Sequence, residues 1–121
     1  MKKGLVILCC LLLIGVTACS NEEQTNHEES KEQMIERVLQ EGNYVMLDVR
    51  TKEEYEESHI KGAINIPYDE IDEKTDLAKE KTIFVYCRSG KRSGIAYDTL
   101  TKLGYNVIDL GAFDSINMEK E

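Results

Sequence analysis

Cysteine is scarce in this 121-residue chain after residue 19. Cys9, Cys10 and Cys19 lie within that stretch, and Cys87 is the one cysteine that follows it. A single thiol excludes a disulfide within the rest of the chain. Such a thiol is either buried and inert or used in chemistry, and composition does not distinguish the two.

Positive charge is also in short supply, because 15 basic residues face 23 acidic ones and the formal net charge is −8 at pH 7. Nucleic acids and anionic lipid headgroups select basic surfaces, so neither is expected as a partner. The sequence shows no internal repeat, and its length suits one domain at most.

The N-terminal apolar run is too short to span a bilayer. It covers residues 5–14, whereas a spanning helix needs roughly 20 apolar residues. Lys2 and Lys3 precede the run, and this order is typical of an export signal.

The residues after the run sharpen this interpretation. Val16-Thr17-Ala18-Cys19 resembles a bacterial lipobox, in which the cysteine is lipidated and becomes the new N-terminus. We therefore expect a lipoprotein signal peptide over residues 1–18 and a lipid on Cys19. The protein would be exported and extracytoplasmic, and would contact a bacterial membrane only through that lipid. An ordinary signal peptide or a short uncleaved anchor is the alternative.

Residues 19–29 are polar and acidic and cannot bury apolar surface, so we expect a disordered tether there. A folded domain is expected over residues 30–121. At its start, Ser30 and Gln33 form a capping-box pattern before helically spaced apolar residues, and Gly42 ends that helix.

Further elements alternate along the domain. Thr51 and Glu54 repeat the capping-box pattern and predict a short helix that ends near residue 57. Apolar runs predict strands, and a second helically spaced run predicts a longer helix; residues 69–79 read as helical turns and loop. The strands are expected over residues 44–49, 62–66, 82–86 and 106–110, and the longer helix over residues 94–103. This order predicts an α/β fold with a small parallel sheet of four to five strands and helices on both faces.

The strand over residues 82–86 runs directly into Cys87, and a basic loop follows it. Parallel α/β sheets bind ligands at the carboxyl ends of their strands. A strand–loop–helix turn directs backbone N–H groups and the positive end of the helix into one concavity, which would bind an anion and stabilise a thiolate. We expect Cys87 to be the reactive group and the loop to bind substrate through Arg88, Ser89, Gly90, Lys91, Arg92 and Ser93.

The three loop cations are not equivalent in this prediction. Arg92 lies where the following helix is expected to begin, so it is the favoured substrate contact. Arg88 and Lys91 could equally be solvated charges.

Several motifs occur in an order that resembles a single-domain rhodanese, over about residues 30–111. They are Leu47-Asp48-Val49-Arg50, Glu54-Tyr55, HIKGAINIP at residues 59–67, and VYCRSGKRS at residues 85–93. The resemblance implies a sulfurtransferase in which Cys87 carries a persulfide. It implies a small anionic sulfur donor such as thiosulfate and a thiol or cyanide as acceptor, with no cofactor and no metal.

The resemblance also implies supporting roles for Asp48 and Arg50, which would brace the surroundings of the active site. Asp48 could equally be an ordinary helix-entry cap. His59 matches a structural motif of the family rather than a catalytic one. The chain departs from the family in having no convincing strand before Ser30 and no tryptophan after Gly111.

Two other functions remain open. A Cys-dependent phosphatase or arsenate reductase would use C-x(5)-R or a longer loop to hold a tetrahedral oxyanion, whereas Cys87 and Arg92 form C-x(4)-R, which suits one bound sulfur atom. A lipid-anchored sulfur carrier or partner-binding module with incidental turnover is the second alternative. The intact Cys87 loop argues against a degenerate binding domain but is compatible with a carrier.

Overall fold

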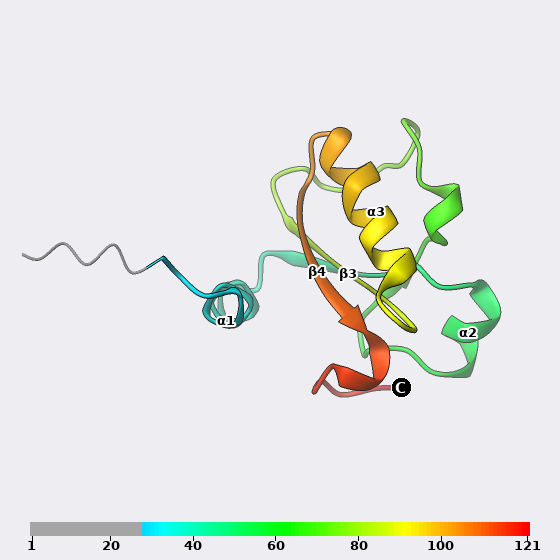
Figure 1. The fold of residues 1–121 in the computed structure, drawn as a ribbon, viewed down its shortest axis with the longest axis horizontal. Coiled ribbons are helices and arrows are strands. Elements are labelled where there is room, and N and C mark those ends of the chain that lie inside the picture. The colour runs from blue at the N-terminus through cyan, green and yellow to red at the C-terminus, as the bar shows by residue number, and fades with distance from the viewer. Residues whose placement is uncertain (1–27) are drawn as a thin grey trace, which may run out of the picture.

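Helices and strands alternate along residues 28–121, the part of the chain that the computed structural model describes (Figure 1). The two η elements are single 3-10 turns. In chain order the elements are α1 (Lys31–Glu41), β1 (Tyr44–Asp48), α2 (Lys52–Glu57), β2 (Ile64–Asn65), η2 (Tyr68–Glu70), β3 (Thr82–Cys87), α3 (Lys91–Lys102), β4 (Asn106–Ala112) and η3 (Phe113–Ser115).

The two capping boxes expected from the sequence are confirmed. The Ser30 hydroxyl accepts a hydrogen bond from the Gln33 N–H at 3.2 Å, and the Gln33 side chain accepts one from the Ser30 N–H at 2.9 Å. Thr51 and Glu54 form the same reciprocal pair at the start of α2. Gly42 ends α1 in the left-handed conformation, with a φ of 73°.

The four strands of the described residues form one parallel sheet in the order β2-β1-β3-β4. This confirms the predicted α/β class and the small parallel sheet. β1 and β3 are neighbours, and Asp48 at the end of β1 lies opposite Tyr86. The carboxyl ends of both strands therefore meet at one edge of the sheet, beside Cys87.

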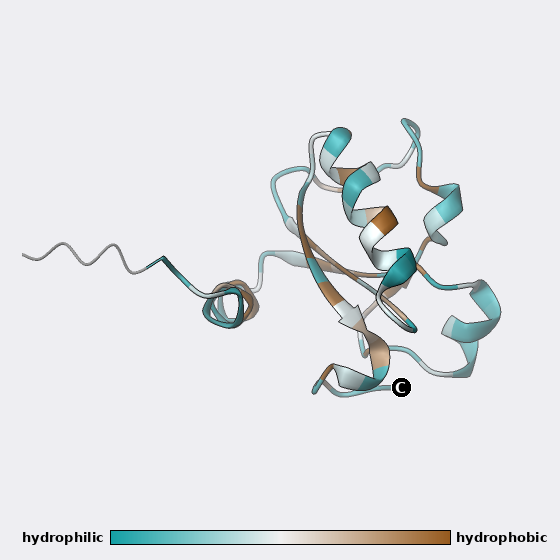
Figure 2. Ribbon diagram, in the orientation of Figure 1, coloured by the Kyte–Doolittle hydropathy of each residue, from teal (hydrophilic) through white to brown (hydrophobic). Residues whose placement is uncertain are grey.

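Helices cover both faces of the sheet, as expected. Successive residues of a strand point to opposite faces, so the core is divided into two clusters. On one face Val38 of α1 belongs to a cluster with Met46 and Phe84. On the other face Leu100 of α3 belongs to a cluster with Leu47. Brown residues run along the strands in Figure 2, whereas α2 is largely teal.

β4 contains a β-bulge where its pairing with β3 shifts by one residue. Val85 lies opposite Asp109, whereas Tyr86, the next residue of β3, lies opposite Gly111. The strand then continues to Ala112, beyond the boundary at residue 110 that the sequence predicted, because it goes on pairing with the end of β3.

Two further predictions of element boundaries are wrong. α3 begins at Lys91 rather than at residue 94, because Gly90 takes a positive φ of 97° and turns the chain directly into the helix. The strand expected over residues 62–66 is reduced to β2, which is flanked by Gly62 with a φ of 85° and by Pro67, which has no N–H to donate.

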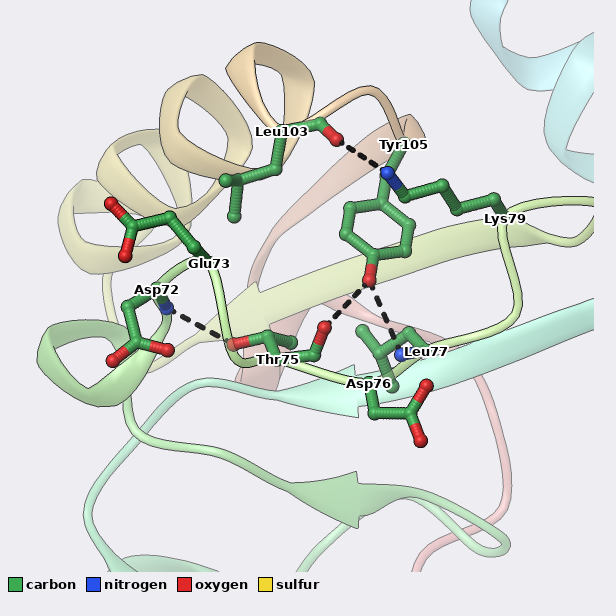
Figure 3. Close-up of a pocket in the computed structure, with 8 residues that line it drawn as sticks. All are labelled: Asp72, Glu73, Thr75, Asp76, Leu77, Lys79, Leu103 and Tyr105. Atoms are coloured by element: carbon green, nitrogen blue, oxygen red, sulfur yellow. Dashed lines mark hydrogen bonds between the residues drawn. The ribbon is translucent and has the colours of Figure 1, made fainter.

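The connection from β2 to β3 has little regular structure, and the helical turns expected over residues 69–79 are limited to η2. Hydrogen bonds from side chains connect this segment to the end of α3 and the residues that follow it (Figure 3). The Tyr105 hydroxyl donates to the Thr75 carbonyl at 2.9 Å and accepts from the Leu77 N–H at 3.2 Å, and Lys79 donates to the Leu103 carbonyl at 3.0 Å. The hollow of about 470 Å³ between them lies at the end of α3 that is remote from Cys87.

The predicted signal peptide over residues 1–18, the lipidation site Cys19 and most of the tether over residues 19–29 lie outside the described residues. Of the tether, residues 28 and 29 are described, and the Glu29 carboxylate forms an ion pair with Arg37 at 2.8 Å. Within residues 28–121, none of the helices is long and apolar enough to cross a membrane.

Candidate active site

Cys87 ends β3, and its side chain is fully buried on the face of the sheet that α3 covers. Arg88, Ser89 and Gly90 connect it to α3. The Gly90 N–H donates a hydrogen bond to the Cys87 Sγ at 2.9 Å. Glycine suits this position because a side chain at a φ of 97° would strain the backbone. The thiol thus lies where the strand, the loop and the first turn of the helix meet.

Opposing effects set the acidity of this thiol. Burial acts to raise the pKa of Cys87, but hydrogen bonds from the Ser93 hydroxyl and from the N–H groups of Ser93, Gly90 and Ser89 outweigh it. The pKa of the thiol therefore lies below its ordinary value. The N–H donors belong to the loop and the first turn of α3, where helix N–H groups have no partner within the helix. This arrangement favours a thiolate and suits a reactive cysteine better than an inert one.

The three loop cations have different surroundings. Arg88 and Lys91 are exposed and form no ion pair within residues 28–121. Arg92 is half-buried, and its Nη1 and Nη2 donate to the two carboxylate oxygens of Glu54 at 2.7 and 3.1 Å. Arg88 and Lys91 are thus free to meet an anion, whereas Arg92, which the sequence favoured as a substrate contact, is held by Glu54.

Glu54 is the residue at this site that sequence reasoning missed. Its pattern with Thr51 indicated a helix cap, and that role is present. Its second role, with Arg92, joins residues 38 positions apart, and no local signal reveals such a pair. The hydrogen bond to Arg92 is the largest reason why the pKa of Glu54 falls to about 2.

Asp48 and Arg50 form a buried ion pair at the same edge of the sheet. The Arg50 Nε lies 3.0 Å from both Asp48 carboxylate oxygens, and Nη2 donates to Asp48 Oδ2 at 2.7 Å. Nη2 also donates to the Ser58 carbonyl at 2.6 Å. The pair therefore links the end of β1 to the chain after α2.

Phe113 is a second contributor that the sequence did not reveal. Its ring stacks on Tyr86, with centroids 5.7 Å apart, and the Arg50 guanidinium carbon lies 4.3 Å from its centroid. Phe113 follows β4 directly, in the region where the sequence lacks the tryptophan common in the family. An aromatic side chain therefore covers the Arg50 guanidinium.

A hollow of about 410 Å³ lies beside the Cys87 loop and is lined by Arg50, Glu54, Glu57, Arg88, Phe113 and Asp114. It adjoins the loop because Arg88 directly follows Cys87 and because Glu54 holds Arg92 of the first turn of α3. The hollow carries both positive and negative side chains. It differs in this respect from the loop itself, whose charges are all positive.

His59 takes part in packing. Its ring stacks on Tyr55 with centroids 3.9 Å apart, and its Nδ1 lies 2.8 Å from the Tyr55 carbonyl oxygen. Its backbone N–H donates to the Glu121 carbonyl at 2.9 Å. These contacts agree with a structural role. Among residues 28–121, no group of three His, Cys, Asp or Glu side chains is arranged to hold a metal ion.

A model of the rhodanese-like domain family matches residues 30–118. The chain belongs to the rhodanese-like domain family. This rhodanese-like domain is 41% identical over 78 residues to Thiosulfate sulfurtransferase PspE of Escherichia coli (strain K12), and the match covers 61% of the chain and 75% of that protein. It is 35% identical over 82 residues to YrkF of Bacillus subtilis (strain 168), whose name provisionally describes a sulfur carrier protein. That match covers 67% of the chain but 44% of YrkF, so the chain spans under half of this relative.

Solved structures share the fold of this rhodanese-like domain. One is described as a rhodanese with anions from E. coli and has a TM-score of 0.59 at 36% identity. The match covers 64% of the present chain and 96% of that chain. Another, the Alr3790 protein from Anabaena sp., has a TM-score of 0.62 at 26% identity, with 73% of the present chain and 76% of that chain covered. The parallel sheet with helices on both faces is therefore the rhodanese-like fold.

Proposed function

We propose that this protein is a sulfurtransferase that moves a sulfane sulfur from a small anionic donor, such as thiosulfate, to a thiol or cyanide through a persulfide on Cys87. The observation that carries the proposal is the set of donors around Sγ. The Gly90 N–H lies 2.9 Å from the sulfur, and the pKa of the thiol is lowered by Ser93, Gly90 and Ser89 against the effect of burial.

The first step of the proposed reaction is attack of the Cys87 thiolate on the outer sulfur of thiosulfate. A bond forms between Sγ and that sulfur, the sulfur–sulfur bond of the donor breaks, and sulfite leaves with the electron pair. Arg88 and Lys91 favour approach of the dianion because both are exposed and unpaired within residues 28–121.

The second step is attack of the acceptor on the terminal sulfur of the persulfide. The bond between Sγ and that sulfur breaks, its electron pair stays on Sγ, and the Cys87 thiolate is restored. A persulfide is itself an anion, so the donors that favour the thiolate would also stabilise the intermediate. One cysteine is thus sufficient for both steps of this nucleophilic catalysis.

Intact-mass spectrometry of the purified full-length protein tests the proposal. Incubation with thiosulfate should add one sulfur atom to the protein, and cyanide should then remove it. Cys87→Ser should add none. If the wild-type protein gains no sulfur from thiosulfate or from an organic persulfide, the sulfurtransferase proposal is wrong.

A sulfur carrier is the second candidate, and the similarity to YrkF favours it. A carrier would load as readily as an enzyme but would discharge slowly to small acceptors such as cyanide. The loading rate and the rate of discharge to cyanide, measured on the same preparation, distinguish the two. Multiple turnovers as fast as loading would contradict the carrier function.

We also propose that the protein is exported and tethered to a bacterial membrane by a lipid on Cys19, after removal of residues 1–18. The support is the sequence pattern of a positive start, a ten-residue apolar run and a lipobox. Expression of the full chain with a radiolabelled fatty acid should label the wild-type protein but not Cys19→Ala. Equal labelling of the two would contradict lipidation at Cys19.

A further inference from the structure

Nη1 of the Arg50 guanidinium has no partner among the described residues, although the other two nitrogens do. Its side chain is 6% exposed, and its Nε and Nη2 are bonded to Asp48 and to the Ser58 carbonyl. Its Nη1 has no hydrogen-bond partner among residues 28–121, although Arg50 lines the hollow beside the Cys87 loop. Buried polar groups normally have partners, so this nitrogen points to a ligand that would accept from it.

The other charges of the hollow differ in how far they are already neutralised. Glu54 is paired with Arg92. Arg88, Glu57 and Asp114 are exposed and form no ion pair within the described residues. The hollow therefore offers one free positive side chain and two free negative ones. A purely anionic ligand would meet the two acids, and a purely cationic ligand would meet Arg88.

We propose that this hollow binds the acceptor of the sulfur-transfer reaction, and that the acceptor is an α-amino-acid thiol, a small molecule with a thiol, a carboxylate and an ammonium group. The proposal rests on the sulfurtransferase function proposed above. The carboxylate would accept from Arg88 and from Nη1 of Arg50, and the ammonium would face Glu57 and Asp114. The volume of about 410 Å³ lies within the range of small-molecule sites, roughly 300–1,000 Å³.

Arg88 both lines the hollow and directly follows Cys87, so an acceptor bound here would hold its thiol beside the Cys87 loop. After losing its proton to solvent, the acceptor sulfur attacks the terminal sulfur of the Cys87 persulfide. The bond from Sγ to that sulfur breaks, the Cys87 thiolate is restored, and the acceptor leaves as its own persulfide. No external oxidant or reductant is needed, because the sulfane sulfur passes from one thiolate to another.

Discharge of the loaded full-length protein by four small thiols tests the inference. Cysteine carries both charges, cysteamine only the ammonium, 3-mercaptopropionate only the carboxylate, and 2-mercaptoethanol neither. Loss of the extra sulfur is followed by intact mass, and acceptors are compared at equal thiolate concentration. We expect half-saturation by cysteine at about tenfold lower concentration than by 2-mercaptoethanol, because each partly exposed ion pair contributes a factor of roughly two to five.

Charge-removing variants assign the two ends of the ligand. Combining Glu57→Gln with Asp114→Asn should raise the half-saturating concentration about threefold or more for cysteine and cysteamine but not for the other two thiols. Arg88→Gln should do so for cysteine and 3-mercaptopropionate. Glu56→Gln is the matched control, since Glu56 is an exposed α2 acid that does not line this hollow. It should leave all four values unchanged.

Two results would overturn the inference. One is half-saturation by all four thiols at the same thiolate concentration, and the other is an equal effect of the double variant on every thiol. Failure of the underlying sulfurtransferase function would look different, because the protein would then gain no sulfur before any acceptor is added.

Discussion

Ser93 offers the most direct test of what makes Cys87 reactive. Its side chain is fully buried, and its hydroxyl lowers the pKa of the Cys87 thiol. Because the site is buried, water is not at hand to replace the hydroxyl in Ser93→Ala. The N–H donors of the loop stay in place, so the variant removes one donor from Sγ and leaves the others.

The size of the effect follows from one charge-assisted hydrogen bond. Such bonds contribute about 1.5–3 kcal/mol, and one pKa unit corresponds to about 1.4 kcal/mol. The Ser93 hydroxyl has one hydrogen, which it donates to the Gly90 carbonyl at 3.0 Å. It can donate to the thiolate only in place of that bond, so the low end applies. We expect the pKa of Cys87 to rise by about one unit in Ser93→Ala. Below both pKa values the thiolate fraction then falls about tenfold, whereas well above them it is unchanged.

The assay is the rate of alkylation by iodoacetamide as a function of pH, read by intact mass. The midpoint gives the pKa of Cys87, and the plateau at high pH should be the same in both proteins. Ser89→Ala is the matched control, since the Ser89 side chain is exposed and its N–H donor remains. An unchanged midpoint in Ser93→Ala, or an equal shift in Ser89→Ala, would refute the role given to the hydroxyl.

Three further variants test the supports of the site by chemical denaturation. Glu54→Gln loses the ion pair with Arg92 and should lower the free energy of unfolding by about 1 kcal/mol at pH 7. Because the folded-state pKa of Glu54 is about 2, below its ordinary value, this deficit should be complete above the ordinary pKa and should shrink as the pH falls toward 2. Arg50→Ala leaves Asp48 buried without its partner and should cost about 3–5 kcal/mol. The methyl group of Gly90→Ala would lie at an ordinary contact distance of 3.8 Å from the Gly111 Cα, but the residue must keep a positive φ, which should cost about 1–2 kcal/mol.

Each of these variants has a control on the same chain. Glu56→Gln should lack the pH dependence of Glu54→Gln, and Arg37→Ala, which removes an exposed ion pair, should lower the free energy of unfolding far less than Arg50→Ala does. Gly94 lies inside α3 with open space around it, so Gly94→Ala should stabilise by up to about 1 kcal/mol. Variants that match their controls would contradict the structural role assigned to the original residue.

Local patterns predicted the elements of this fold well. Ser30 with Gln33 and Thr51 with Glu54 are capping boxes whose partners lie three residues apart, so the sequence contains the whole interaction. Cys87 was found at the end of a strand because apolar residues lead directly into a polar loop. These patterns involve residues close together in the sequence, and the structure contains the elements that they predict.

Long-range partners could not be predicted in the same way. The helix start was placed at residue 94 because Gly90 and the polar residues after it read as a loop, whereas the backbone turn at Gly90 already begins α3. Arg92 was expected to contact substrate because it lies where the helix begins. Its ion pair with Glu54 could not be predicted, because the two residues are 38 positions apart and lie on different helices. Nη1 of Arg50 is left without a partner because Asp48 and the Ser58 carbonyl bind the other guanidinium nitrogens. That arrangement depends on tertiary structure and has no signal in the local sequence.

The bulge in β4 limits the insertions and deletions that the protein can tolerate. In a strand, a shift of one residue moves every later side chain to the opposite face of the sheet. The extra residue between Asp109 and Gly111 is what brings Phe113 to the face of Tyr86, where it covers the guanidinium of Arg50. One residue inserted or deleted between Gly111 and Phe113 would present a different neighbour there. Single insertions and deletions at this short stretch should therefore be far less acceptable than substitutions that keep its length.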